Sequence, residues 1–267
     1  IQAINPSQVM AKNDSNVKVK KNSGTKITWY GHAAFKIMTP SGKVILIDPW
    51  ITNPANKNGK ADLESMNKAD LILVTHGHFD HIGDSIQIAG KTKAKLVSTF
   101  DLGSAIVQAG YPKDLVGYDT QGNFGGSLDL LNGEVKITFI PAVHSSGLSI
   151  PDKGDIYGGN PGGFLISIKN GPSIYHTGDT DLFSDMSLIS KFAKVTVMLS
   201  TIGDHFTMGP DRAAEAVKMV NPAWVVPMHF GTFPILTGTT EVFSKELTKR
   251  GLHKNLKIIK VHEELAN

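Results

Sequence analysis

The stretch Leu71-Ile72-Leu73-Val74-Thr75-His76-Gly77-His78-Phe79-Asp80-His81 joins an apolar run to three histidines and a carboxylate. Its first four residues are apolar and favour β structure, which predicts a short buried strand that ends at Thr75. Residues 76–81 would then lie on the loop leaving that strand, where donor atoms can converge. Imidazole binds Zn, Fe, Ni and Mn, and a carboxylate adds the negative charge that a second dication requires. A solvated histidine-rich turn is the alternative, but three histidines beside one carboxylate favour a metal site.

Four side chains on one short loop cannot complete the coordination of two metals, so further ligands are expected downstream. Three candidates each follow a β-like segment: His144 after residues 135–140, Asp179 after residues 173–176, and His229 after residues 224–228. Layered α/β folds gather their functional residues just past the carboxyl ends of strands. These three residues therefore occupy the positions expected of additional ligands.

The order of these motifs resembles the metallo-β-lactamase superfamily of binuclear metallohydrolases. The motifs are HGHFDH, AVHSS, YHTGDT and PMHFGTF. Four overlapping or additional segments, GHAAF, GDTDLFSDM, GDHFTMGP and VPMHFGTFP, are similar to the UPF0173 or UlaG-like metal-dependent hydrolases. The likeness extends from about residue 27 to residue 259. It implies an α/β fold, the four-layer αββα sandwich of two mixed β-sheets known as the metallo-β-lactamase fold.

The resemblance also implies a ligand set for two divalent metal ions. The seven ligands would be His76, His78 and His144 for one metal, Asp80, His81 and His229 for the other, and Asp179 as the bridge. Zinc is the expected metal, with Mn, Fe or Ni as alternatives.

Two adjacent dications would form a shared hydroxide near neutral pH, because they lower the pKa of bound water. After subtraction of Asp80, Asp179 and one hydroxide, the site keeps a charge of about +1, which favours a transition state that gains negative charge on oxygen. Hydrolysis of a lactone, ester, amide or phosphodiester passes through such a state. Asp80 is the expected catalytic residue, since it could also orient the hydroxide or transfer a proton.

Arginine is scarce, since Arg212 and Arg250 are the only two in the chain. Without an arginine cluster to fix a phosphate, a small-molecule lactone, ester or amide is favoured over a phosphodiester. Two other functions stay open at this stage. One is a phosphodiesterase or nuclease of the same superfamily, for which a basic groove is expected. The other is a metal-binding scaffold without catalysis.

Three further residues are candidates near the pocket. Asp48 follows the apolar run 44–47 and is expected to accept a hydrogen bond from a ligand imidazole. His32, in GHAAF, is a candidate substrate contact, with a hydrogen-bonded turn histidine as the alternative. His205 is a candidate substrate or oxyanion contact, with a packed loop histidine as the alternative. His176 occupies a strand position and is expected in the core.

Composition fits one loop-rich α/β domain, because 267 residues with 40% hydrophobic content can bury a substantial core. Residues 1–25 are expected to form a polar N-terminal arm and residues 26–267 the hydrolase domain. The net charge of +3 is small and the lysines are dispersed, which argues against nucleic-acid binding. No apolar run approaches the roughly 18 residues of a membrane span. A homo-oligomer stays open.

The chain has no cysteine, so every metal ligand must be His, Asp or Glu. It also begins without a methionine. Removal of a signal peptide would leave such a start, which slightly favours an exported or periplasmic protein over a cytoplasmic one.

Helix signals predict helices over residues 101–109, 184–192, 210–220 and 240–250. Besides the strands named above, β-like runs include residues 26–30, 34–38, 95–98, 115–118, 163–168, 195–199 and 256–259. Residues 145–162 are rich in Gly and Pro and are expected to wall the pocket, either as a lid or as a plain connection.

Overall fold

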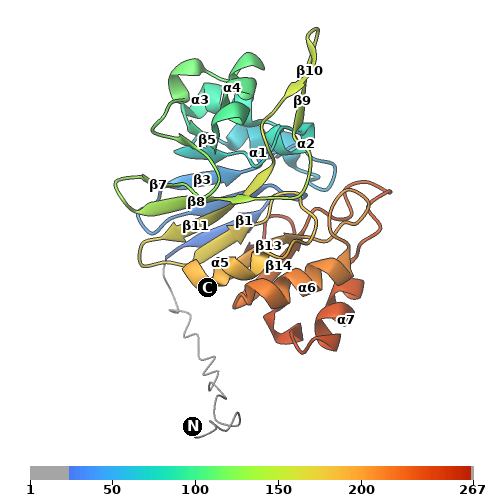
Figure 1. The fold of residues 1–267 in the computed structure, drawn as a ribbon. Helices are drawn as coiled ribbons and strands as arrows, with labels where there is room; N and C mark the ends of the chain where they lie inside the picture. Colours follow the sequence, from blue (N-terminus) through green and yellow to red (C-terminus); the bar gives the residue numbers. More distant parts are fainter. Residues whose placement is uncertain (1–23, 266–267) are drawn as a thin grey trace, which may run out of the picture.

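The computed structural model describes residues 24–265, which form two large β-sheets with helices on their outer faces (Figure 1). Both sheets contain parallel and antiparallel strand pairs. This arrangement is the predicted four-layer αββα sandwich. The predicted arm, residues 1–25, lies outside the described residues except for its last two.

The first sheet has seven strands. In spatial order they are β15 (Glu264–Leu265), β1 (Lys26–Trp29), β2 (Phe35–Met38), β3 (Val44–Ile47), β4 (Leu71–Leu73), β5 (Lys95–Thr99) and β6 (Gln121–Gly122). Its outer face is packed against α1 (Gly59–Ser65), α3 (Ser85–Thr92) and α4 (Phe100–Gln108). β3 and β4 are buried on both faces, which explains why their sequences are continuously apolar.

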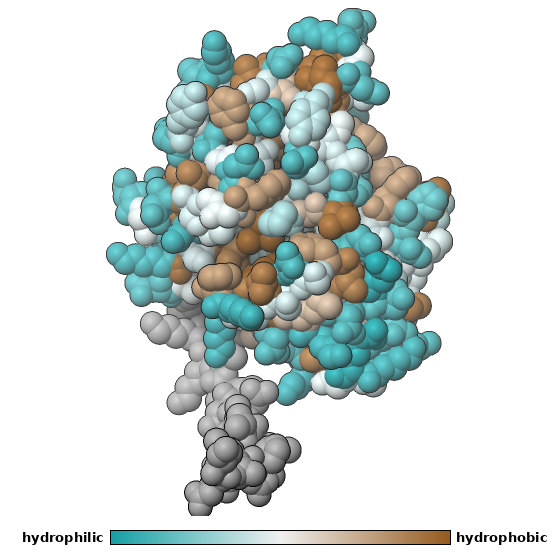
Figure 2. Space-filling view, viewed as in Figure 1, coloured by the Kyte–Doolittle hydropathy of each residue, from teal (hydrophilic) through white to brown (hydrophobic). Residues whose placement is uncertain are grey.

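The second sheet has six strands. In spatial order they are β14 (Trp224–Met228), β13 (Val197–Thr201), β12 (Ser173–His176), β11 (Gly162–Ile168), β8 (Val135–Pro141) and β7 (Ser127–Leu130). The helices α5 (Met186–Phe192), α6 (Pro210–Val220) and α7 (Thr240–Lys249) pack on the outer side. Between α5 and the outer faces of β8 and β11 lies an apolar groove of about 780 Å³. Figure 2 shows apolar side chains gathered over this part of the surface.

The main core fills the space between the two sheets. It is built by alternation along the strands: Phe35 and Ile37 of β2 point inward, as do Ile137 and Phe139 of β8. Their neighbours Lys36 and Lys136 stay outside this core. The two inner faces thus hold the sheets together, and the strand ends remain available for the site.

Two predicted strands are wrong. Residue 115 ends a 3-10 helix, Lys113–Leu115, and residues 116–118 form no strand, because the fixed backbone of Pro112 starts a local turn in which Leu115 N–H bonds to Pro112 O at 3.0 Å. Residues 256–259 form only an isolated bridge from Leu256 to Val225, after which the chain leaves the second sheet to reach β15 in the first.

The Gly- and Pro-rich stretch 145–162 contains a hairpin of β9 (Gly147–Ile150) and β10 (Gly154–Tyr157), which projects from the body in Figure 1. The tight connection relies on left-handed backbone at Asp152 and Gly154. Among residues 24–265, no helix combines the length and apolar character needed to cross a membrane.

Candidate metal centre

The seven predicted ligands converge at one edge of the two sheets. Each follows a strand or lies on the short helix α2 (Phe79–Ile82) just beyond β4: His76 and His78 after β4, Asp80 and His81 on α2, His144 after β8, Asp179 after β12, and His229 after β14. The short strands end where these polar residues begin, so the backbone delivers all seven side chains to one region.

The first donor set consists of His76, His78 and His144. His78 Nδ1 lies 3.0 Å from His76 Nε2 and 3.3 Å from His144 Nε2, so three ring nitrogens converge. His76 is buried and the other two are half-buried. Burial lowers the pKa of all three imidazoles. They are therefore neutral near pH 7, the form in which histidine binds metals.

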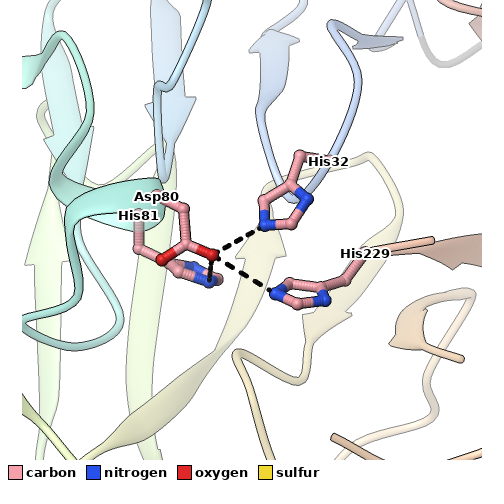
Figure 3. A group of neighbouring side chains, drawn as sticks. All are labelled: His32, Asp80, His81 and His229. Carbon is pink, nitrogen blue, oxygen red and sulfur yellow. Dashed lines mark hydrogen bonds and ion pairs between the residues drawn. The ribbon is translucent and has the colours of Figure 1, made fainter. Parts of the chain in front are cut away.

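The second donor set consists of Asp80, His81 and His229, shown in Figure 3 together with His32. Asp80 Oδ2 lies 3.5 Å from His229 Nε2 and 3.8 Å from His81 Nε2. Burial alone would lower the pKa of His229, but the nearby carboxylates, chiefly Asp179, raise it to about 9. In the same way Asp179, Asp48 and Asp80 outweigh burial and raise the pKa of His81. The second set is thus rich in negative charge.

Asp179 lies between the two sets. Its Oδ2 is 3.0 Å from His229 Nε2, 3.3 Å from His81 Nε2, 3.7 Å from His144 Nε2 and 4.0 Å from His76 Nε2. The preceding Gly178 has left-handed backbone, and a Cβ there would lie 2.2 Å from Gly162 O, so this turn requires glycine. One buried carboxylate oxygen therefore faces histidines of both sets.

Several buried polar atoms of the cluster have no hydrogen-bond partner. They are Nε2 of His81, both ring nitrogens of His229 and Oδ1 of Asp179. An unpaired buried polar atom costs about 1–3 kcal/mol. Four such atoms in one cluster therefore indicate that a ligand binds there. Imidazole and carboxylate donors fit divalent zinc, manganese, iron or nickel.

Asp48 lies behind the second set and is fully buried. Its Oδ2 is 2.7 Å from His81 Nδ1 and accepts a hydrogen bond from Thr75 Oγ1, while Oδ1 accepts one from the Thr75 N–H at 2.8 Å. Since a carboxylate only accepts, His81 Nδ1 carries a proton, and Nε2 would be the nitrogen that donates its electron pair to a metal.

His32 lies in the turn between β1 and β2 and is fully buried. Its Nε2 is 2.9 Å from Asp80 Oδ2 and its Nδ1 is 2.8 Å from Thr232 Oγ1. The His32 carbonyl accepts hydrogen bonds from the backbone N–H of His229 and from the indole of Trp29, both at 3.0 Å. This is a hydrogen-bonded turn histidine that reaches the second donor set.

Three residues of this site have left-handed backbone although none is glycine. The φ angles are 50° at His32, 43° at Asp48 and 57° at His229. Such conformations are uncommon for residues with a Cβ and concentrate at functional sites.

The structure does not bring His205 into the cluster. It is exposed on the loop after β13, where its ring contacts Phe206 edge-on at 4.5 Å. Within residues 24–265, no hydrogen bond or ion pair joins it to the seven residues. His176 is buried in the core, where its Nε2 is 3.1 Å from Ala33 O.

The sequence alone does not single out Ser146 and Thr232. Ser146 Oγ accepts the Gly77 N–H at 2.9 Å and donates to Gly158 O at 2.7 Å, which ties the ligand loop to the hairpin. Thr232 contacts His32, 200 positions away in the chain. The only sequence signal for these two residues is that they follow the predicted ligands His144 and His229 by two and three positions.

Comparison with known proteins agrees with this fold and site. The family model described as the β-lactamase superfamily domain matches residues 26–229. Fold and site thus define the class as a metal-dependent hydrolase of this superfamily.

Individual relatives identify the family within this superfamily. The chain is 64% identical over 242 residues to a UPF0173 metal-dependent hydrolase of Thermodesulfovibrio yellowstonii, covering 90% of this chain and 91% of that protein. A second UPF0173 hydrolase, from Anaeromyxobacter, is 56% identical over 220 residues, covering 81% of this chain and 78% of its own. The solved structure of Igni18, a metallo hydrolase from Ignicoccus hospitalis, is 36% identical with a TM-score of 0.77, covering 90% and 97% of the two chains. The chain therefore belongs to the UPF0173 family of metal-dependent hydrolases.

Proposed function

We propose that this enzyme is a binuclear metallohydrolase acting on a neutral small-molecule lactone, ester or amide. The first donor set would hold one divalent cation and the second the other, and Asp179 would be the ligand shared by both. The observation that carries this proposal is the position of Asp179 Oδ2, within 4.0 Å of ring nitrogens from both sets. Zinc is the expected metal, with manganese, iron or nickel as alternatives.

Two bound dications would supply a Lewis acid and a hydroxide nucleophile near neutral pH. The protein's part is to hold the donors in place. Asp48 keeps Nε2 of His81 directed to the centre, since it binds the proton on Nδ1. Asp179 and Asp80 supply the negative charge that two cations require.

Asp80 is the proposed catalytic residue, and His32 fixes its orientation. Burial lowers the pKa of His32 to about 4, so this imidazole is neutral and carries one proton. The proton lies on Nε2, which donates to Asp80 Oδ2, because a carboxylate can only accept; Nδ1 then accepts from the Thr232 hydroxyl. Asp80 Oδ1 stays available to orient the attacking water or accept its proton.

The charge pattern supports a neutral substrate. Among residues 24–265, no lysine or arginine forms an ion pair with Asp80 or Asp179, whose partners are all histidines. Arg212 is held by Asp181 at 2.6 and 2.8 Å. Arg250 pairs with Glu215 and Glu246. No free guanidinium is therefore available to bind a phosphate.

The test combines metal analysis with a hydrolysis screen. The purified enzyme is expected to hold two metal ions per chain and to hydrolyse members of a lactone, ester and amide panel. His78→Ala should lose one metal and the turnover, whereas His253→Ala, at an exposed histidine, should keep both. One metal per chain would contradict the binuclear site. Turnover of phosphodiesters alone would contradict the substrate class, and no turnover would favour the scaffold.

A further inference from the structure

Three aromatic side chains form a continuous surface beside the second donor set. This aromatic panel consists of Trp50, Phe79 and Phe233. The ring of Trp50 lies 5.6 Å from Phe79 in an edge-on arrangement and 5.9 Å from Phe233 in a stacked one. Both Trp50 and Phe233 contact the ring of His32 edge-on, at 5.4 and 5.9 Å. The panel thus reaches the metal centre through the histidine that bonds Asp80.

The panel is open to solvent at Phe79. This side chain is 69% exposed although it stands between two proposed metal ligands, His78 and Asp80. The short helix α2 is anchored by its buried residues His81 and Ile82, so its packing does not need the Phe79 ring. A single exposed phenylalanine is ordinary. An exposed ring that continues into two half-buried rings beside a reaction centre is typical of a ligand surface.

The aromatic panel carries no charge. The polar side chains between it and the metal centre are hydrogen-bonded to one another. His32 uses both ring nitrogens on Asp80 and Thr232. A group lying on the panel would therefore find aromatic faces and edges but no hydrogen-bonding partner from His32. Aromatic side chains of this kind bind flat apolar groups by stacking and edge-to-face contact.

We propose that the aromatic panel binds an aromatic or similarly flat apolar substituent of a neutral substrate whose scissile bond lies at the metal centre. This inference rests on the proposed function for its substrate class. It adds a specificity site to the reaction centre.

A probe that cannot be hydrolysed tests the panel independently of catalysis. N-phenyl-1-naphthylamine is neutral and apolar, and its fluorescence rises on binding to an apolar surface. The metal-loaded protein is expected to bind it, and Phe79→Ala should weaken binding about tenfold, the loss of roughly one aromatic contact with its buried area. Because Phe79 is mostly exposed, this variant should fold normally.

The matched control is Phe192→Ala. Phe192 is 86% exposed on α5 and lines the apolar groove on the outer side of the second sheet. Its removal should leave probe binding unchanged. Binding that depends on Phe192 but not Phe79 would assign the probe to the groove and overturn the proposal. Absence of binding to the wild-type protein would also overturn it.

Selectivity provides the second measurement. The ratio of kcat/KM for phenyl acetate to that for ethyl acetate should fall about tenfold in Phe79→Ala, with metal content unchanged. An unchanged ratio would contradict the panel. If neither ester is hydrolysed while probe binding still requires Phe79, the proposed ester chemistry fails and the panel stands.

Discussion

The two halves of the metal centre differ in what lies behind them. In the first donor set, His76 is buried with its Nδ1 3.0 Å from Thr75 Oγ1, whereas His78 and His144 are half-buried and His78 Nε2 lies 3.3 Å from Ser145 Oγ. In the second set, His81 is backed by the buried carboxylate of Asp48, and Asp80 is backed by His32. In the first half only His76 is backed by a buried side chain, whereas in the second half a buried partner lies behind both His81 and Asp80.

This difference suggests a division of labour. Side chains whose orientation is fixed by outer hydrogen bonds bind metal more tightly than side chains that must be ordered on binding. We therefore expect the second set to hold its metal more firmly.

The most severe change would remove the residue that both halves share. Asp179→Ala should lose both metals and lower turnover by about 1000-fold or more, since metal-assisted stabilisation of the transition state is worth several kcal/mol. Metal analysis and steady-state kinetics give the measurement. Asp181→Ala, at an exposed carboxylate two positions away, should retain both metals. Two tightly bound metals in Asp179→Ala would contradict the bridging role.

Removal of one ligand from either half separates the two sets. His144→Ala should keep only the second-set metal, and His81→Ala only the first-set metal, because each leaves the other set of donors intact. Metal stoichiometry at limiting free metal distinguishes them. Loss of both metals from either variant would mean that the seven residues act as one site.

The support behind the second set can be weakened without touching a ligand. Asp48→Asn removes the charge that holds the proton of His81 Nδ1, and should lower the affinity for the second metal about 10–100-fold. Competition with a chromophoric chelator measures this affinity. Ser145→Ala is the matching change behind the first set and should have a smaller effect. Equal effects of the two variants would remove the contrast between the halves.

The outermost part of the network should give the smallest effect. Thr232→Val preserves shape but leaves His32 Nδ1 buried without a partner, which should destabilise the metal-stripped protein by about 1–3 kcal/mol in urea. Thr232→Ser restores the hydroxyl and should recover most of the loss. Equal stability of the Val and Ser variants would show that this hydrogen bond contributes nothing.

The sequence predicts the fold and family well, because the signals are local. A short apolar run followed by HGHFDH identifies both a strand end and a ligand type, and the same logic applies to His144, Asp179 and His229. The predicted fold class and family are confirmed. The ligand roles stay predictions, although the structure brings all seven side chains together.

The contacts that organise the site depend on long-range packing and could not be predicted. His32 meets Asp80 across 48 positions because of the strand order of the first sheet, and it meets Thr232 across 200 positions because of how the two sheets pack. The strand wrongly predicted at residues 115–118 has a local cause. Its apolar pattern favours β structure, but Pro112 commits the segment to a local turn.

The left-handed backbone at His32, Asp48 and His229 has an evolutionary consequence. Each such residue costs about 1–2 kcal/mol, and glycine would relieve most of that strain. At His229 the backbone cost adds to that of burying Nδ1 without a hydrogen-bond partner. Selection for thermal stability alone would therefore tend to replace His229 by another residue. Its retention would reflect selection for activity, and a programme that stabilises the enzyme by consensus or library screening should hold these three positions fixed.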